Sequence, residues 1–167
     1  MRKILDGLFM GSAWLAALSM IIVLIMVLIS MVGRLLNFYA PGTDAYAGYA
    51  MAASGFLALA HTLKRGEHIR VTLIVGKLTG AGRKVMELWA LLVGSALSAL
   101  IALYSWRLVM QSHQFHDIST GNDATPLWLP QMFMAIGATV LVIALIDEWV
   151  LEWQNRRSHH SEETRHE

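Results

Sequence analysis

Four long apolar runs separated by shorter polar stretches dominate the chain. They cover about residues 8–33, 45–63, 85–111 and 128–153. A helix rises 1.5 Å per residue, so the first run alone exceeds the ~30 Å thickness of a bilayer's hydrocarbon core. It is also too long for the apolar part of a signal peptide, which is usually ~7–15 residues. The pattern predicts an all-α integral membrane protein with four transmembrane helices, in a single domain over residues 1–153.

The polar connection between the second and third runs contains a further helical pattern. Its apolar residues recur at i, i+3, i+4 and i+7, and they are Val71, Ile74, Val75 and Leu78. This spacing places them on one side of a helix, while Arg70 and Lys77 point elsewhere. We expect a short amphipathic helix at about residues 69–78, lying in the membrane interface.

Composition supports the membrane assignment and removes some chemistry. Hydrophobic residues make up 56% of the chain and charged residues only 15%, against about 25% in a typical soluble domain. The chain contains no cysteine, which excludes disulfide exchange, thiol nucleophiles and cysteine-ligated metals. We expect no enzymatic activity, no cofactor, no metal and no nucleic-acid partner.

Positive charges predict the orientation of the four spans. Eleven of the thirteen Lys and Arg residues fall on one side of a four-span arrangement, and only Arg34 and Arg107 fall on the other. Cytoplasmic loops carry the excess of Lys and Arg, so both termini are expected in the cytoplasm. Residues 154–167 then form a polar cytoplasmic tail.

The third apolar run carries small residues at every fourth position, namely Ala90, Gly94, Ser98 and Ala102. Small residues allow another helix to approach closely, and such packing drives helix association in lipid. The spacing leaves open whether the partner helix lies within this chain or in another one.

Histidines and acids are the candidates for chemistry. His61 is expected near the cytoplasmic face, most simply hydrogen-bonded to a neighbour, whereas His113 and His116 lie near the outer face. A haem ligated between facing helices would need two histidines at similar depth, so this arrangement disfavours it. Asp147, Glu148 and Glu152 lie near a cytoplasmic end, where they can meet cations, and we expect neither a buried ion pair nor an internal carboxylate.

The second outer loop, at about residues 112–130, contains Asp117 and Asp123. Acidic residues in such a loop are usually solvated, but they could also receive a partner outside the membrane. Arg34 and Arg107 are expected to anchor helix ends at the outer interface.

Two motifs resemble those of a known family. Gly66-Glu67-His68-Ile69-Arg70-Val71 follows the second run, and Thr125-Pro126-Leu127-Trp128-Leu129-Pro130-Gln131 opens the fourth. Together with four spans, they resemble the small membrane subunit of tripartite ATP-independent periplasmic (TRAP) transporters, the DctQ-like family. The motif residues used for the comparison are Gly66, His68, Arg70, Pro126, Trp128 and Pro130.

The resemblance implies a small, non-catalytic scaffold subunit in the bacterial inner membrane. In that family a periplasmic binding protein delivers an organic acid, such as a dicarboxylate or sialic acid. A large, DctM-like membrane subunit moves it by sodium-coupled symport. The resemblance thus implies that Ala90, Gly94, Ser98 and Ala102 pack against the large subunit, that Asp117 and Asp123 help to receive the binding protein, and that membrane lipids surround the rest. The alternative is a self-contained four-helix membrane protein, either a cytochrome-like redox subunit or a small exporter.

Overall fold

The computed structural model of the chain describes residues 2–38, 41–64, 81–121 and 123–153. Several predictions concern residues outside these ranges. They are the amphipathic helix at 69–78 with Val71, Ile74, Val75 and Leu78, the motif residues Gly66, His68 and Arg70, and the tail at 154–167.

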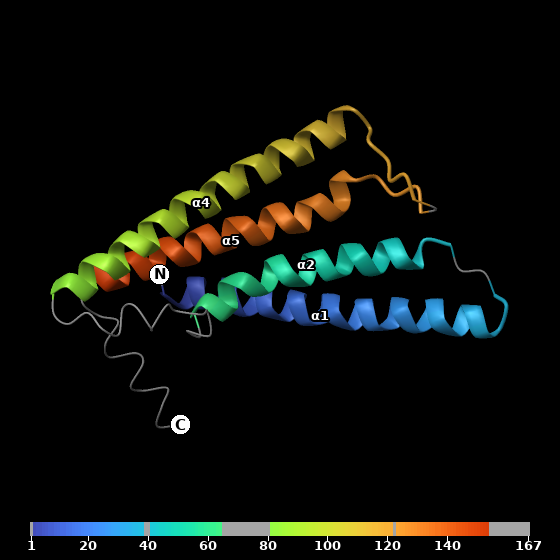
Figure 1. The fold of residues 1–167 in the computed structure, drawn as a ribbon, viewed down its shortest axis with the longest axis horizontal. Helices are drawn as coiled ribbons and strands as arrows, with labels where there is room; N and C mark the ends of the chain where they lie inside the picture. Colours follow the sequence, from blue (N-terminus) through green and yellow to red (C-terminus); the bar gives the residue numbers. More distant parts are fainter. Residues whose placement is uncertain (1, 39–40, 65–80, 122, 154–167) are drawn as a thin grey trace, which may run out of the picture.

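The described residues form four long helices that lie side by side in one layer (Figure 1). Their bounds are Arg2–Leu35 for α1, Thr43–Lys64 for α2, Ala81–Gln114 for α4 and Trp128–Trp153 for α5. The order across the layer is α1, α2, α5, α4, and each helix packs mainly on its immediate neighbours. The molecule is therefore two helical hairpins, α1–α2 and α4–α5, joined along the seam between α2 and α5.

Three of the four helices are long and apolar enough to cross a membrane, over Leu5–Leu35, Lys84–Gln114 and Trp128–Trp153. The fourth, α2, is rich in Ala and Gly and carries fewer large apolar side chains. It also lies inside the layer, where α1 and α5 cover its two flanks. The structure thus supports the all-helical class, with three membrane-capable helices where the sequence predicted four spans.

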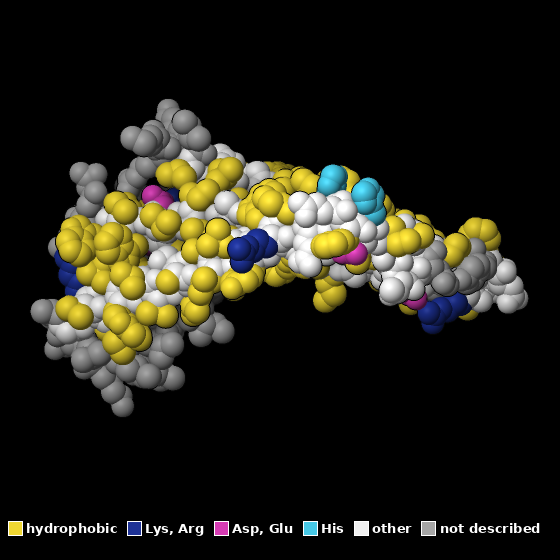
Figure 2. All heavy atoms as spheres, turned by 90° about the horizontal axis from the view of Figure 1, so that it is seen from above, with side chains coloured by type: hydrophobic (Ala, Val, Ile, Leu, Met, Phe, Trp, Pro, Cys, Tyr) yellow, Lys and Arg dark blue, Asp and Glu magenta, His cyan; other side chains and the backbone are white. Residues whose placement is uncertain are grey.

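The core between the helices consists largely of alanine. Ala60, Ala135 and Ala144 have no exposed surface, and Leu57 is the largest side chain that is fully buried within the described residues. Small side chains allow neighbouring helices to approach closely, as expected for packing in lipid. The large apolar side chains instead point outwards and cover much of the surface, as Figure 2 shows for the view from above.

Two helices end in a similar way at the same end of the layer. After α1, Asn37 adopts a left-handed φ of 52° and the Phe38 amide donates to the Gly33 carbonyl at 2.8 Å. After α4, His116 has a φ of 54° and the Asp117 amide donates to the Ser112 carbonyl at 3.0 Å. Both are Schellman-type ends, which satisfy carbonyls that would otherwise lack partners.

Candidate functional site

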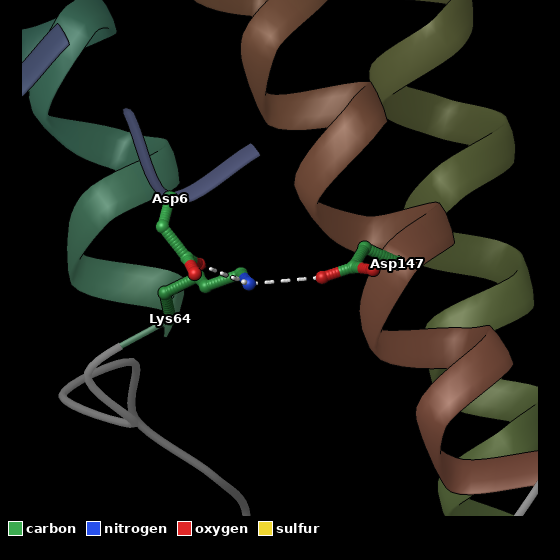
Figure 3. A network of polar contacts seen from close by, with 3 residues as sticks. All are labelled: Asp6, Lys64 and Asp147. Carbon is green, nitrogen blue, oxygen red and sulfur yellow. Dashed lines mark hydrogen bonds and ion pairs between the residues drawn. The ribbon is translucent and has the colours of Figure 1, made fainter. Parts of the chain in front are cut away.

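A cation joins three helices at one end of the layer (Figure 3). Lys64, the last residue of α2, places its Nζ 2.9 Å from Oδ2 of Asp147 on α5 and 3.5 Å from Oδ1 of Asp6 on α1. The same Nζ lies 4.7 Å from the centre of the Phe9 ring, within cation–π range. The Lys64 and Asp147 side chains are only 24% and 20% exposed. The expectation that Asp147 meets a cation is therefore confirmed.

The expectation of no buried ion pair and no internal carboxylate is wrong at this end. Lys64 and Asp147 form a largely buried pair, and Glu148, the next residue on α5, is only 8% exposed. Both residues lie within the predicted fourth run, and the packing of α5 against its neighbouring helices covers them.

Midway along the seam, α2 and α5 approach each other at Gly137. A Cβ added to Gly137 would lie 2.6–2.8 Å from the backbone carbonyl and Cβ of Phe56. Real Cβ contacts are essentially never that short, and backbone cannot swing aside as a flexible side chain can. Glycine is therefore required at this position for the two helices to pack at this distance.

A network centred on Asp123 joins the hairpins at the opposite end. Its Oδ2 accepts a hydrogen bond from the Tyr49 hydroxyl at 3.0 Å, and its Oδ1 accepts one from the Ser119 hydroxyl at 2.8 Å. Nearby, the Thr125 hydroxyl donates to the Tyr46 hydroxyl at 3.2 Å. Tyr46 and Tyr49 belong to α2, so the loop between α4 and α5 is attached to the other hairpin.

The charge of Asp123 is stabilised by these contacts. The pKa of the Asp123 carboxyl is lowered from 3.8 to about 2. The largest cause is a hydrogen bond with Thr125, and those with Ser119 and Tyr49 act in the same direction, whereas burial partly raises the pKa. Hydroxyl donors favour the ionised form of a carboxyl group. Asp123 thus stays ionised at any physiological pH and its oxygens are engaged within the chain.

The two acids predicted to receive a partner therefore differ. Asp117 is exposed, and its backbone takes part in the loop: its carbonyl accepts a hydrogen bond from the Leu127 amide at 3.0 Å. Asp123 is half-buried and holds the loop to α2. Of the pair, only Asp117 presents an exposed carboxylate.

The motif that opens the fourth helix shapes this loop. Pro126 forms an isolated antiparallel bridge with Ile118, and Trp128 is the first residue of α5. The Trp128 ring packs edge-on against His113 with ring centres 5.4 Å apart. Pro130 lies in the first turn, where a helix does not need the amide hydrogen that proline lacks. The motif thus directs the chain from the loop into α5.

The small residues of α4 do not share one buried face. Ser98 and Ala102 are buried, whereas Ala90 is exposed. Gly94 faces α5, since a Cβ built on it would lie 3.9 Å from Cδ2 of Leu145. Each step of four residues rotates by about 40° around a helix, so four such positions drift across about 120°.

The face of α4 that does meet α5 repeats at steps of three and four residues. Its buried members are Ser98, Ala102, Ser105, Val109 and Ser112. This is the heptad-like spacing of a close antiparallel helix pair. The Trp106 indole donates a hydrogen bond across the pair to the Thr139 hydroxyl at 3.1 Å.

The three histidines among the described residues do not gather into a ligand set. His61 is half-buried in the last turn of α2, at the Lys64 end, whereas His113 contacts Trp128 at the opposite end. Within the residues that the structure describes, no three His, Asp or Glu side chains could hold a metal ion together. The polar groups that do meet hold helices together.

Comparison with known families agrees with this architecture. Residues 12–155 match the family model described as "Tripartite ATP-independent periplasmic transporters, DctQ component". The match covers most of the chain, so the chain belongs to the DctQ family of TRAP transporters. Membership makes it a transporter component and implies a partner membrane component and a binding protein. A search of curated proteins found no match.

The sequence did not predict the ion pair of Lys64 with Asp147, the hydrogen-bond network of Asp123 or the close contact at Gly137. Lys64 and Asp147 are a cation and an acid at the ends of two predicted spans, which is a usable signal for pairing. A lone glycine within the strongly apolar fourth run could likewise have indicated a close helix approach. Tyr49, which donates to Asp123, and Tyr46, which accepts from Thr125, left no comparable signal, because aromatic residues at a span end are expected for the interface alone.

Proposed function

We propose that this chain is the small, non-catalytic scaffold subunit of a sodium-coupled importer in the bacterial inner membrane. Its large membrane partner binds and moves an organic acid, such as a dicarboxylate or sialic acid, that a periplasmic binding protein delivers. The observation that carries the proposal is the single layer of helices. A path for a charged solute must be shielded from lipid on all sides, and one row of helices cannot enclose such a path.

The polar contacts support a scaffold role. Lys64, Asp147 and Asp123 face partners on neighbouring helices or loops, and Gly137 serves packing. Each of these features holds the two hairpins together.

The proposed topology has four spans with both termini in the cytoplasm, so the Lys64 end lies inside. The distribution of Lys and Arg supports this orientation. We include α2 as a span because it has 22 residues, enough for ~33 Å of helix. Its flanks are shielded from lipid by α1 and α5, which lessens its need for large apolar side chains.

Two surfaces remain as proposed contacts with partners. On α4, Ser98 and Ala102 are covered by α5 within the chain. Ala90 is exposed and is therefore the residue of this set that we propose to contact the large subunit. At the outer loop, Asp117 is the proposed contact for the binding protein, with Asp123 as the residue that fixes the loop.

A mild-detergent purification of the tagged chain from its native membranes tests the proposal. Mass spectrometry should identify one large polytopic membrane protein in an equal amount. Recovery of the small chain alone would contradict the scaffold role. The self-contained alternative would gain support if the lone chain showed a haem absorption band or transported a solute by itself.

A further inference from the structure

One basic residue lies on the open edge of the layer. Arg107 belongs to α4, which packs on α5 alone among the described helices. The flanking residues Ser105 and Val109 are buried against that neighbour. Because a helix turns about 100° per residue, Arg107 lies about 200° from each of them and points away from α5. It is exposed in the structure.

The surroundings of Arg107 resemble a surface in contact with lipid. Leu103, Tyr104 and Met110, one turn away on either side, are all at least 60% exposed. Gln111, one turn towards the loop, is also exposed and adds an amide donor to the same face. The face thus combines apolar side chains with a cation and hydrogen-bond donors.

The helix carries no acid near Arg107. Within α4 the single acidic residue is Glu87, twenty positions earlier, and residues 88–106 between them carry no charge. Twenty residues of helix span ~30 Å, which equals the thickness of the hydrocarbon core. Arg107 therefore stands where that core ends and lipid phosphates begin, and its long side chain can extend into this region.

We propose that Arg107, with the Tyr104 hydroxyl and the Gln111 amide, binds the phosphodiester group of a phospholipid on the α4 edge. Guanidinium groups bind phosphate oxygens through paired hydrogen bonds. Large, flexible apolar neighbours suit acyl chains better than a closely packed protein helix, which would favour small residues. The proposal rests on the proposed membrane subunit, and its topology places this lipid in the outer leaflet.

Arg34 provides a matched comparison. It is also an exposed arginine at the loop end of a long helix, but it has an acidic neighbour within the chain, since Oδ2 of Asp44 lies 3.8 Å from its guanidinium. Arg34→Gln therefore removes the same charge without removing the proposed lipid contact.

Native mass spectrometry of the complex tests the proposal with phosphatidylglycerol as the probe. The complex, purified through the tagged chain, is titrated with the lipid, and lipid-bound peaks are counted. Arg107→Gln should weaken the tightest lipid-binding step about tenfold, because a hydrogen-bonded charge is lost. Arg107→Lys should show intermediate binding, because it keeps the charge but loses the paired hydrogen bonds, and Arg34→Gln should match the parent. Inorganic phosphate at equal concentration should not compete.

Equal lipid binding by Arg107→Gln and the parent would overturn the proposal. Competition by inorganic phosphate would overturn the assignment to lipid, and so would a structure of the complex with a partner's carboxylate paired to Arg107. The same spectra show whether the large partner is present, so failure of lipid binding is distinguishable from failure of the proposed function.

Discussion

The two ends of the α2–α5 seam are held by different chemistry. At the Lys64 end, one ammonium lies between two carboxylates and an aromatic ring, and the central pair is largely buried. At the Asp123 end, one carboxylate accepts hydrogen bonds from neutral hydroxyl groups in a loop. A buried pair becomes costly when one partner is removed, since the other charge stays behind. A network near water loses less, because water replaces each donor.

The two ends therefore have different structural roles. The ion pair of Lys64 with Asp147, called the charged clamp below, and the contact at Gly137 fix the distance between the two hairpins, whereas the Asp123 network fixes the shape of the loop between α4 and α5. Substitutions in the charged clamp or at Gly137 should therefore reduce the stability of the whole layer of helices. Substitution of Asp123 should change only the loop.

The largest effect is expected at the charged clamp. Asp147→Asn leaves the largely buried Lys64 with only its longer contact to the exposed Asp6. We expect the free energy of unfolding to fall by about 2–4 kcal/mol, somewhat less than for a fully buried pair. Thermal unfolding of the detergent-purified protein measures the loss. The double variant Lys64→Met with Asp147→Leu should be closer to the parent than Asp147→Asn is. A double variant less stable than the single one would contradict the account.

The next largest effect is expected at Gly137. Gly137→Ala forces α2 and α5 apart at Phe56 and should destabilise the protein by about 1–3 kcal/mol. Gly55→Ala on α2 is the matched control, because a Cβ there meets nothing within 4 Å. The control should be neutral or slightly stabilising, since alanine favours helix over glycine. Equal unfolding temperatures for the two variants would show that the close approach is absent.

A smaller, local effect is expected at Asp123. Asp123→Ala removes the acceptor for Tyr49 and Ser119, so the amides of residues 115–127 should exchange hydrogen faster while the helices stay protected. Asp117→Ala is the control, because its exposed side chain has no comparable role in the loop. Hydrogen exchange read by mass spectrometry distinguishes them. Loss of protection throughout α2 and α5 would contradict the claim that the Asp123 network stabilises only the loop.

The smallest effect is the pH dependence of this loop. The folded pKa of Asp123, about 2, lies below its unfolded value of 3.8. A depressed pKa stabilises the folded loop fully above the unfolded value, and this stabilisation is lost as pH falls through the folded value. Loop protection should thus be constant from pH 8 to about 5 and should decline below about 4. A decline that begins near pH 6 would contradict the role given to Asp123.

Hydropathy predicted the helical class and the approximate positions of the helices, because long apolar runs have few other solutions. It did not predict that the helices lie in one layer, since that depends on which faces meet. Steps of four residues placed Ala90 on the same face as Ser98 and Ala102, but the rotation of 100° per residue separates them, so that Ser98 and Ala102 are buried within the chain while Ala90 is exposed. The Asp123 network joins residues 74 positions apart, which no local pattern reveals.

The central claim is that the α2–α5 seam remains closed while the chain serves as a scaffold. Ala60→Cys with Ala144→Cys tests it, because both alanines are fully buried in one cluster and the chain has no other cysteine. Oxidation in native membranes should form the disulfide nearly completely, and the cross-linked chain should still purify with its large membrane partner. A pair that does not cross-link, or a cross-linked chain that has lost this partner, would contradict the account.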